Sequence, residues 1–324
     1  MKLHLGINNI YAAKRWPEPD EWGKQVTQRW GLKHVQFCFD LLDPRCTPEA
    51  RKAMAGKVRE AAAKYGFEIH SVFIGAAAYT YNLLLHPFAE FRKDALDWCQ
   101  LAAITAAELG AQGVGGPIAA ASMRDYRDPG KRQFLQDALV EGMQAWARYA
   151  ADQGLKFVCW EPAPIGREML IRLDEAKNLY ERLNHNVPIP IHFLLDVGHQ
   201  CSYEATGKDR DTYLWLRELG KISPLLHLQQ MDGVWDRHWS FTKAHNAEGV
   251  VQMDQVVKAL EESGAEEVYL FPELIHPFEF PEDKLLEELD ESYEYLKQYV
   301  REPVHAQGAG GAMRTKITGD AAAA

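Results

Sequence analysis

The sequence lacks several features that mark large classes of protein. Its 324 residues contain only five cysteines, none of them in a CxxC pair: Cys38, Cys46, Cys99, Cys159 and Cys201. An odd, scattered set argues against a disulfide framework or a thiolate zinc site and is typical of reduced thiols. The N-terminus "MKLHLGINNIY" has no apolar signal-peptide core, and no apolar run reaches membrane-spanning length. We therefore expect a cytoplasmic protein.

The sequence also lacks an excess of positive charge. It has 36 Lys and Arg against 46 Asp and Glu, which gives a net charge of -10. This balance argues against non-specific binding to nucleic acid or to an anionic membrane surface. A small anionic substrate is not excluded, because it responds to local charge. We expect a small-molecule partner and leave a homo-oligomer open.

One pattern recurs along the chain: an amphipathic helical stretch, then a glycine, then a short apolar run. In "AKYGFEIHSVFI" and "DQGLKFVCWEP", Gly66 and Gly154 stand where a helix needs a left-handed residue at its end. Counting all such runs, with "KLHLGIN" and "PIHFLLDVGH", gives eight candidate strands. The helical patterns between them cover 48–65, 91–109, 131–153, 168–183 and 251–262. Alternating strands and helices predict a parallel sheet.

Eight such units predict a closed (β/α)8 TIM barrel, formed as one domain by residues 1–302. A doubly wound open sheet is the alternative. It is disfavoured because no predicted strand is followed by GxGxxG or a P-loop. A helix near 282–300 would close the ring. The Gly/Ala-rich, non-periodic segment 303–324 is expected to be a disordered tail.

Four consecutive predicted strands end in an oxygen-bearing side chain, and a barrel places its catalytic groups at these strand ends. The four residues are Glu161, Asp196, Gln229 and Glu273. Neighbouring strands lie about 4.8 Å apart, so these groups can converge. Three carboxylates in one cavity require a compensating cation, and hard oxygen ligands favour Mn²⁺ or Mg²⁺, with Co²⁺ also suitable. For any one of these residues, a helix cap or a buried salt bridge is the simpler alternative.

A divalent metal between two glutamates indicates a class of reaction. Chelation of a ketone oxygen and the neighbouring hydroxyl would acidify the C–H bond between them. Glu161 and Glu273 could then act as catalytic base and acid on opposite faces of the substrate. The expected reaction is epimerisation through a metal-bound enediolate, or isomerisation if the proton returns to the adjacent carbon.

These positions resemble the xylose-isomerase-like barrels, which include sugar-phosphate isomerases, ketose 3-epimerases and endonuclease IV. The resemblance to ketose 3-epimerases implies metal ligands at the ends of strands five to eight and an acid/base role for both glutamates. It implies that His199, three residues after Asp196, contacts the substrate. The His-x-His usual on strand seven is here His227-Leu228-Gln229. Gln229 thus stands where the family has its metal-binding histidine.

A closer resemblance covers most of the chain. The segments "LGINNIYAAKRWPEPDEW", "LLDVGHQC" and "LQQMD…HWSFT" are similar to the tetrulose-phosphate 3-epimerases of bacterial erythritol and threitol catabolism. This implies interconversion of L- and D-erythrulose 1-phosphate. The loop "WEPAPIGREM" after strand five is less similar to that group than the rest of the chain is.

A phosphorylated substrate needs donors near the strand ends. The basic candidates are Lys14 and Arg15 after strand one and Arg237, His238 and Lys243 after strand seven, of which Arg237 and His238 follow their strand most closely. With His199 and His227, Arg237 and His238 make up the expected substrate-binding residues. Arg can bind a phosphate through two hydrogen bonds. For each basic loop residue, an ordinary solvated charge is the alternative.

Other functions remain open on the same scaffold. A non-phosphorylated ketose 3-epimerase and a 3-oxo-sugar lyase or decarboxylase would use a similar metal site. A DNA-repair nuclease would need a histidine-rich multi-metal site and basic surfaces. A non-catalytic sugar-binding subunit stays open because Gln229 departs from the family pattern.

Overall fold

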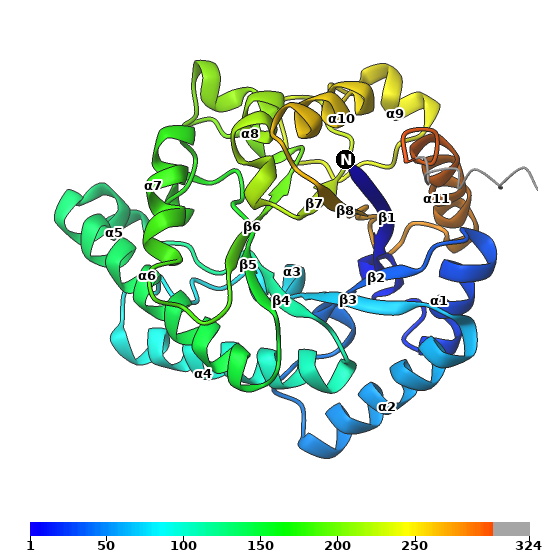
Figure 1. Ribbon diagram of the computed structural model, residues 1–324, viewed down its shortest axis with the longest axis horizontal. Helices are drawn as coiled ribbons and strands as arrows, with labels where there is room; N and C mark the ends of the chain where they lie inside the picture. Colours follow the sequence, from blue (N-terminus) through cyan, green and yellow to red (C-terminus); the bar gives the residue numbers. More distant parts are fainter. Residues whose placement is uncertain (301–324) are drawn as a thin grey trace, which may run out of the picture.

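The structure is a computed structural model that describes residues 1–300, and the tail predicted for 303–324 lies outside this range. Eight parallel strands form a closed barrel inside a ring of helices (Figure 1). Each strand pairs with the next, and β8 pairs with β1. The strands are β1 Lys2–Asn8, β2 His34–Cys38, β3 Glu68–Phe73, β4 Gly113–Gly116, β5 Phe157–Trp160, β6 Ile191–Asp196, β7 Leu225–Leu228 and β8 Glu267–Pro272. The predicted (β/α)8 barrel is confirmed.

Helices cover the outside of the barrel in Figure 1. The longer ones are α2 Pro48–Tyr65, α4 Ala89–Leu109, α6 Pro129–Asp152, α7 Leu173–Leu183, α8 Thr212–Leu219, α10 Met253–Glu262 and α11 Glu282–Leu296. Shorter ones are α1 Pro19–Lys24, α5 Met123–Arg127 and α9 Lys243–Glu248, whereas α3 Gly75–Tyr79 directly follows β3 and lies inside the ring of helices in Figure 1. α1 continues as a π-helical turn over Gln25–Arg29. Short 3-10 turns cover Asn9–Ala12, Phe39–Leu41, Gly166–Glu168, His199–Cys201, Gly207–Arg210 and Gly220–Ile222.

The helix predicted over 168–183 begins later, at Leu173. A 3-10 turn ends at Glu168, and Met169 then adopts a left-handed backbone with φ 70°. A non-glycine residue in this region interrupts a right-handed helix. Gly66 does end α2 in the left-handed conformation that its position predicts, with φ 79°.

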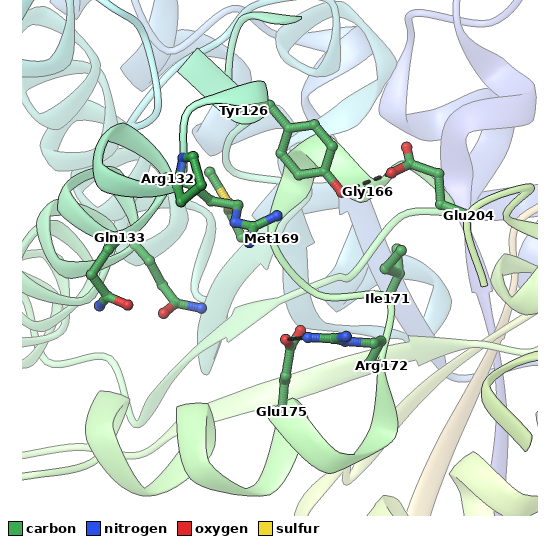
Figure 2. Close-up of a pocket in the computed structure, with 11 residues that line it drawn as sticks. Tyr126, Arg132, Gln133, Gly166, Met169, Ile171, Arg172, Glu175 and Glu204 are labelled. Atoms are coloured by element: carbon green, nitrogen blue, oxygen red, sulfur yellow. Dashed lines mark hydrogen bonds and ion pairs between the residues drawn. The ribbon is translucent and has the colours of Figure 1, made fainter. Parts of the chain in front are cut away.

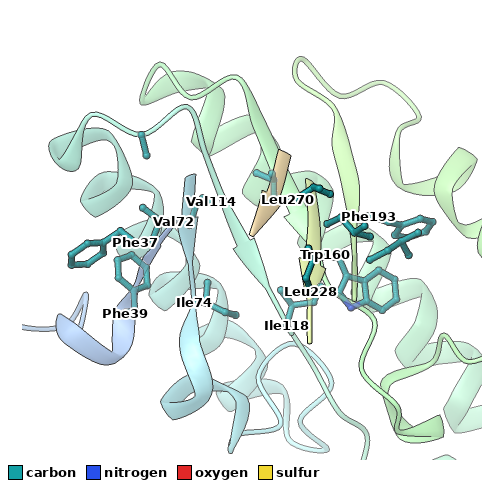
Figure 3. Packing of buried hydrophobic residues seen from close by; sticks show 14 of the residues in the cluster. Phe37, Phe39, Val72, Ile74, Val114, Ile118, Trp160, Phe193, Leu228 and Leu270 are labelled. Carbon is teal, nitrogen blue, oxygen red and sulfur yellow. The ribbon is translucent and has the colours of Figure 1, made fainter. Parts of the chain in front are cut away.

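The barrel strands are apolar on both faces, and the two faces serve different purposes. Outward side chains pack beneath the helices, as Figure 3 shows for Phe37, Val72, Val114, Phe193, Leu228 and Leu270. A smaller buried cluster fills the interior and includes Cys159, Leu194, Leu225 and Phe271. Because side chains alternate along a strand, the next inward positions after Cys159, Leu194, Leu225 and Phe271 are Glu161, Asp196, His227 and Glu273.

Within residues 1–300, none of the helices combines the length and apolarity needed to cross a bilayer.

Candidate active site

Four neighbouring strands bring three carboxylates and one imidazole to the same point. Their ligand atoms all lie within 4.8 Å of one another, and all four side chains are buried: Glu161, Asp196, His227 and Glu273. The convergence expected for the carboxylates of β5, β6 and β8 is therefore present. The fourth member is His227 of β7, which the sequence suggested as a substrate contact.

His227 lies between the two glutamates. Its Nδ1 is 2.7 Å from Glu161 Oε1 and 2.9 Å from Glu273 Oε2. Burial lowers the pKa of His227, but the two carboxylates outweigh it and raise this pKa to about 10. An imidazole nitrogen thus occupies the place where the carboxylates need positive charge.

The pKa values of the two glutamates move in opposite directions. Burial raises the pKa of Glu161; His227 offsets part of this effect, and the neighbouring Glu273 carboxylate raises the pKa again. Burial acts on Glu273 in the same sense, but His227 and His238 outweigh it and lower the pKa of that carboxyl. Two carboxyl groups with divergent pKa values are what an acid and a base need at the same pH.

Gln229 is buried beside this cluster, in a different orientation from the one predicted. Its Nε2 donates to Asp196 Oδ1 at 3.0 Å and to Asp236 Oδ1 at 2.7 Å. Its Oε1 accepts a hydrogen bond from the His238 backbone N–H at 2.6 Å. The amide oxygen predicted to bind metal is therefore held by the loop after β7. The metal-ligand role of Gln229 stays a prediction that this geometry does not favour.

The two carboxylate oxygens of Asp196 have different surroundings. Oδ1 accepts hydrogen bonds from Gly198 N and Gln229 Nε2. Oδ2 is buried and has no hydrogen-bond partner among residues 1–300. A buried carboxylate oxygen without a partner is costly, and a cation would satisfy it. Three buried carboxylates with one imidazole are a donor set that suits a divalent cation.

A second group, His199, Asp236 and His238, lies next to the first. His199 Nδ1 donates to Pro162 O at 2.9 Å, and His238 Nδ1 donates to Glu273 O at 3.0 Å. Their Nε2 atoms face the Asp236 carboxylate at 3.4 and 3.2 Å. The structure thus places both predicted histidines at the site. Asp236 was missed in the sequence, where its signal was the position two residues before His238.

Arg237 is not part of this cluster. Its Nε donates to Asp232 Oδ2 at 2.7 Å, and its guanidinium lies 5.3 Å from the centre of the Trp239 ring.

Glu168 is a further buried acid that the predicted site did not include. Burial raises the pKa of Glu168 to about 8, and His199 partly offsets this effect.

A separate hollow of about 480 Å³ lies beside α5, α6 and the start of α7 (Figure 2). Its charged groups are largely paired: Arg172 binds Glu175, and Tyr126 donates to Glu204 at 2.7 Å. The residues of the described chain that line it include neither cluster. We therefore place the chemistry at the strand ends and not in this hollow.

A closed parallel barrel with acidic and imidazole groups at its C-terminal strand ends defines a TIM-barrel enzyme acting on a small substrate. The chain belongs to the xylose isomerase-like TIM barrel family, whose sequence model matches residues 25–299. The resemblance found in the sequence is thereby confirmed.

Relatives narrow the activity to epimerases and isomerases. The chain is 29% identical over 285 residues to the D-erythrulose 1-phosphate 3-epimerase of Brucella abortus, a match covering 88% of this chain and 92% of the relative. The crystal structure of a candidate xylose isomerase from Rhodospirillum rubrum has a TM-score of 0.85 and 30% identity, with 91% and 99% of the two chains covered. D-psicose 3-epimerase from Clostridium cellulolyticum shares the fold, with a TM-score of 0.67, 17% identity and coverage of 93% and 99%. The protein is an enzyme of this isomerase and epimerase family.

Proposed function

We propose that the protein is a divalent-metal-dependent 3-epimerase of a tetrulose 1-phosphate, interconverting L- and D-erythrulose 1-phosphate. The observation that carries this proposal is the pair of buried carboxyl groups of Glu161 and Glu273, which follow the ends of β5 and β8 and lie 2.7 and 2.9 Å from His227 Nδ1. The opposite directions of their pKa shifts support an acid and a base at this place. The substrate is inferred from the Brucella relative, which matches along most of both chains.

A divalent cation held by Glu161, Asp196, His227 and Glu273 would act as a Lewis acid that lowers the pKa of the C–H bond beside the ketone. Mn²⁺ or Mg²⁺ is the proposed ion, and Co²⁺ would also suit these ligands. One glutamate removes the proton from C3, and the other returns a proton to the opposite face. The two strands that carry them are separated by β6 and β7, so the carboxyl groups can flank a substrate.

The second cluster is proposed to bind the substrate's oxygens. His199 and His238 present Nε2 atoms whose partner nitrogens are fixed by backbone carbonyls. Arg237 and His238 remain the residues proposed to donate hydrogen bonds to the substrate's phosphate. Arg237 would have to exchange its bond to Asp232 for one to phosphate.

We also propose that residues 1–302 form a single domain. We propose that the protein is cytoplasmic, because its five cysteines, all within the described range, are free thiols.

The pairing of Arg237 with Asp232 favours one alternative, a 3-epimerase of non-phosphorylated ketoses. The test is turnover of L-erythrulose 1-phosphate against free erythrulose and free hexuloses, after chelation and reloading with Mg²⁺, Mn²⁺ or Co²⁺. We expect turnover of the phosphorylated tetrulose only. Turnover of free ketoses alone would refute the phosphate assignment, and carbon–carbon cleavage would indicate a lyase.

A further inference from the structure

A chain of buried hydrogen bonds connects the turn after β1 to the carboxylate cluster. The backbone N–H of Ile10 donates to Asn8 Oδ1 at 3.0 Å. Asn8 Nδ2 donates to Gln36 Oε1 at 2.9 Å, and His227 Nε2 lies 2.6 Å from the same oxygen. Asn8, Gln36 and His227 are each at most 1% exposed. The geometry of a chain buried this deeply is set by its own donors and acceptors.

The direction of every bond in this chain follows from its first member. A backbone N–H can only donate, so Asn8 must present its oxygen to Ile10 and its amide nitrogen to Gln36. Gln36 then presents its oxygen to Asn8, and its Nε2 donates to Ser71 Oγ at 3.3 Å. Facing an acceptor at 2.6 Å, the Nε2 atom of His227 must carry a hydrogen.

This hydrogen decides what the other side of the ring can do. With the hydrogen on Nε2 fixed, Nδ1 is the ring atom that can release its proton and offer a lone pair to a cation. Nδ1 is also the atom that lies 2.7 Å from Glu161 and 2.9 Å from Glu273. Gln229 does not offer a competing metal ligand. Its oxygen accepts the hydrogen bond from His238 N–H, and its amide nitrogen can only donate hydrogen bonds.

We propose that Gln36, oriented by Asn8, is a positioning residue that fixes His227 as the Nε2–H tautomer and so makes Nδ1 the nitrogen ligand of the divalent cation. The inference rests on the proposed function only in requiring a cation at this cluster. A ligating histidine whose second nitrogen donates to a fixed oxygen keeps its ring orientation and its basicity, and loss of such a partner typically weakens metal binding by about 10- to 100-fold.

The test compares Gln36→Leu with Gln36→Glu and Ser71→Ala. Gln36→Leu removes the oxygen that accepts from His227, and Gln36→Glu keeps an accepting oxygen there. Ser71→Ala removes the hydrogen bond that Gln36 Nε2 donates and leaves Gln36 Oε1 in place. We would measure Mn²⁺ dissociation constants by electron paramagnetic resonance. The His227 tautomer would be read from ¹⁵N–¹H spectra of histidine-labelled, Mg²⁺-loaded protein. Gln36→Leu should weaken Mn²⁺ binding about 10- to 100-fold and release the tautomer, while the other two variants stay within about threefold of wild type.

Asn8→Asp gives a second route if Gln36→Leu fails to fold. The new carboxylate cannot donate, so Gln36 should turn its Nε2 toward residue 8 and His227, and the ring should change to the Nδ1–H tautomer with weakened Mn²⁺ binding. Wild-type affinity with an unchanged tautomer in Gln36→Leu or Asn8→Asp would overturn the proposal, as would an Nδ1–H tautomer in the Mg²⁺-loaded wild type. These readouts need no substrate. A protein that binds Mn²⁺ as described yet does not turn over erythrulose 1-phosphate would refute the proposed function alone.

Discussion

The two ends of the barrel interior both contain buried histidines, with opposite protonation behaviour. At the N-terminal end, His70 of β3 packs against Tyr269 with ring centres 4.0 Å apart and ring planes tilted by 30°, and burial lowers the pKa of His70 to about 3. At the C-terminal end, His227 of β7 has its pKa raised to about 10 by Glu161 and Glu273. Burial acts in the same direction on both rings. The charges of His34 and His4 lower the pKa of His70 further, whereas Glu161 and Glu273 outweigh burial at His227. One end therefore uses histidine as a neutral packing residue and the other as a functional group.

The largest effects should follow from the acids at the C-terminal end. Glu161→Gln and Glu273→Gln should each lower kcat about 10²- to 10⁴-fold, because each removes a group that transfers a proton. Steady-state assays on the proposed substrate would measure this. Glu68→Gln is the matched control, since Glu68 binds His34 at the opposite end of the barrel. An equal loss in Glu68→Gln would show that the two ends do not differ as described.

Metal binding should stabilise the fold through the C-terminal end of β6 and not through its N-terminal end. A cation at 100 times its dissociation constant should stabilise the fold by about 2.7 kcal/mol, and chelation should remove this increment. Asp196→Asn should abolish the increment, because Asp196 supplies the buried oxygen without a partner. His192→Asn, at the other end of β6, should retain it. Urea denaturation with and without Mn²⁺ is the measurement, and loss of the increment in His192→Asn would contradict the assignment.

His70, at the N-terminal end of the barrel, should lower the free energy of unfolding in mild acid. The pKa of His70 is lowered on folding, so the unfolded chain binds the proton more strongly. Stability should therefore be complete above about pH 6.5 and decline as the pH falls toward 3, by about 2 kcal/mol at pH 5 from this residue. His70→Phe should remove that part of the decline in urea denaturation at pH 7 and pH 5. A decline of the same size in His70→Phe would assign it to other groups.

The smallest effect is expected at the rim of the active end. Arg237→Ala should raise KM for a phosphorylated tetrulose about tenfold, equivalent to about 1.4 kcal/mol, and leave free ketoses unaffected. Arg29→Ala is the control, because Arg29 is engaged with Asp290 on α11. Unchanged KM values in Arg237→Ala would remove Arg237 from the phosphate site.

Much of the architecture was predictable because it depends on local patterns. Glycine after a helical run and apolar strands at regular spacing indicated the barrel, and the polar residues closing those strands indicated Glu161, Asp196 and Glu273. The roles of His227 and Gln229 were not predictable. Their side chains leave the same end of β7, and the choice between them depends on the fold of the loop that follows, whose residues Asp236 and His238 hold the Gln229 amide.

Residues on the first two strands were also missed. Asn8 and Gln36 interrupt the apolar runs "KLHLGIN" and "HVQFC" in the same way that His227 interrupts "LLHL". A buried amide within an apolar strand was the available signal, because such a group must find a partner. The partner itself lies 191 residues away in the chain and becomes evident only in the closed barrel.

The most direct test is proton exchange at C3 of erythrulose 1-phosphate, followed by ¹H NMR in D₂O with the Mg²⁺-loaded enzyme. C3 is the single stereocentre of this sugar, so exchange should be accompanied by loss of optical rotation. We expect the C3 proton signal to disappear with wild type and to persist when Glu161 and Glu273 are both replaced by glutamine. Exchange at the wild-type rate in that double variant, or no exchange with wild type, would contradict the account.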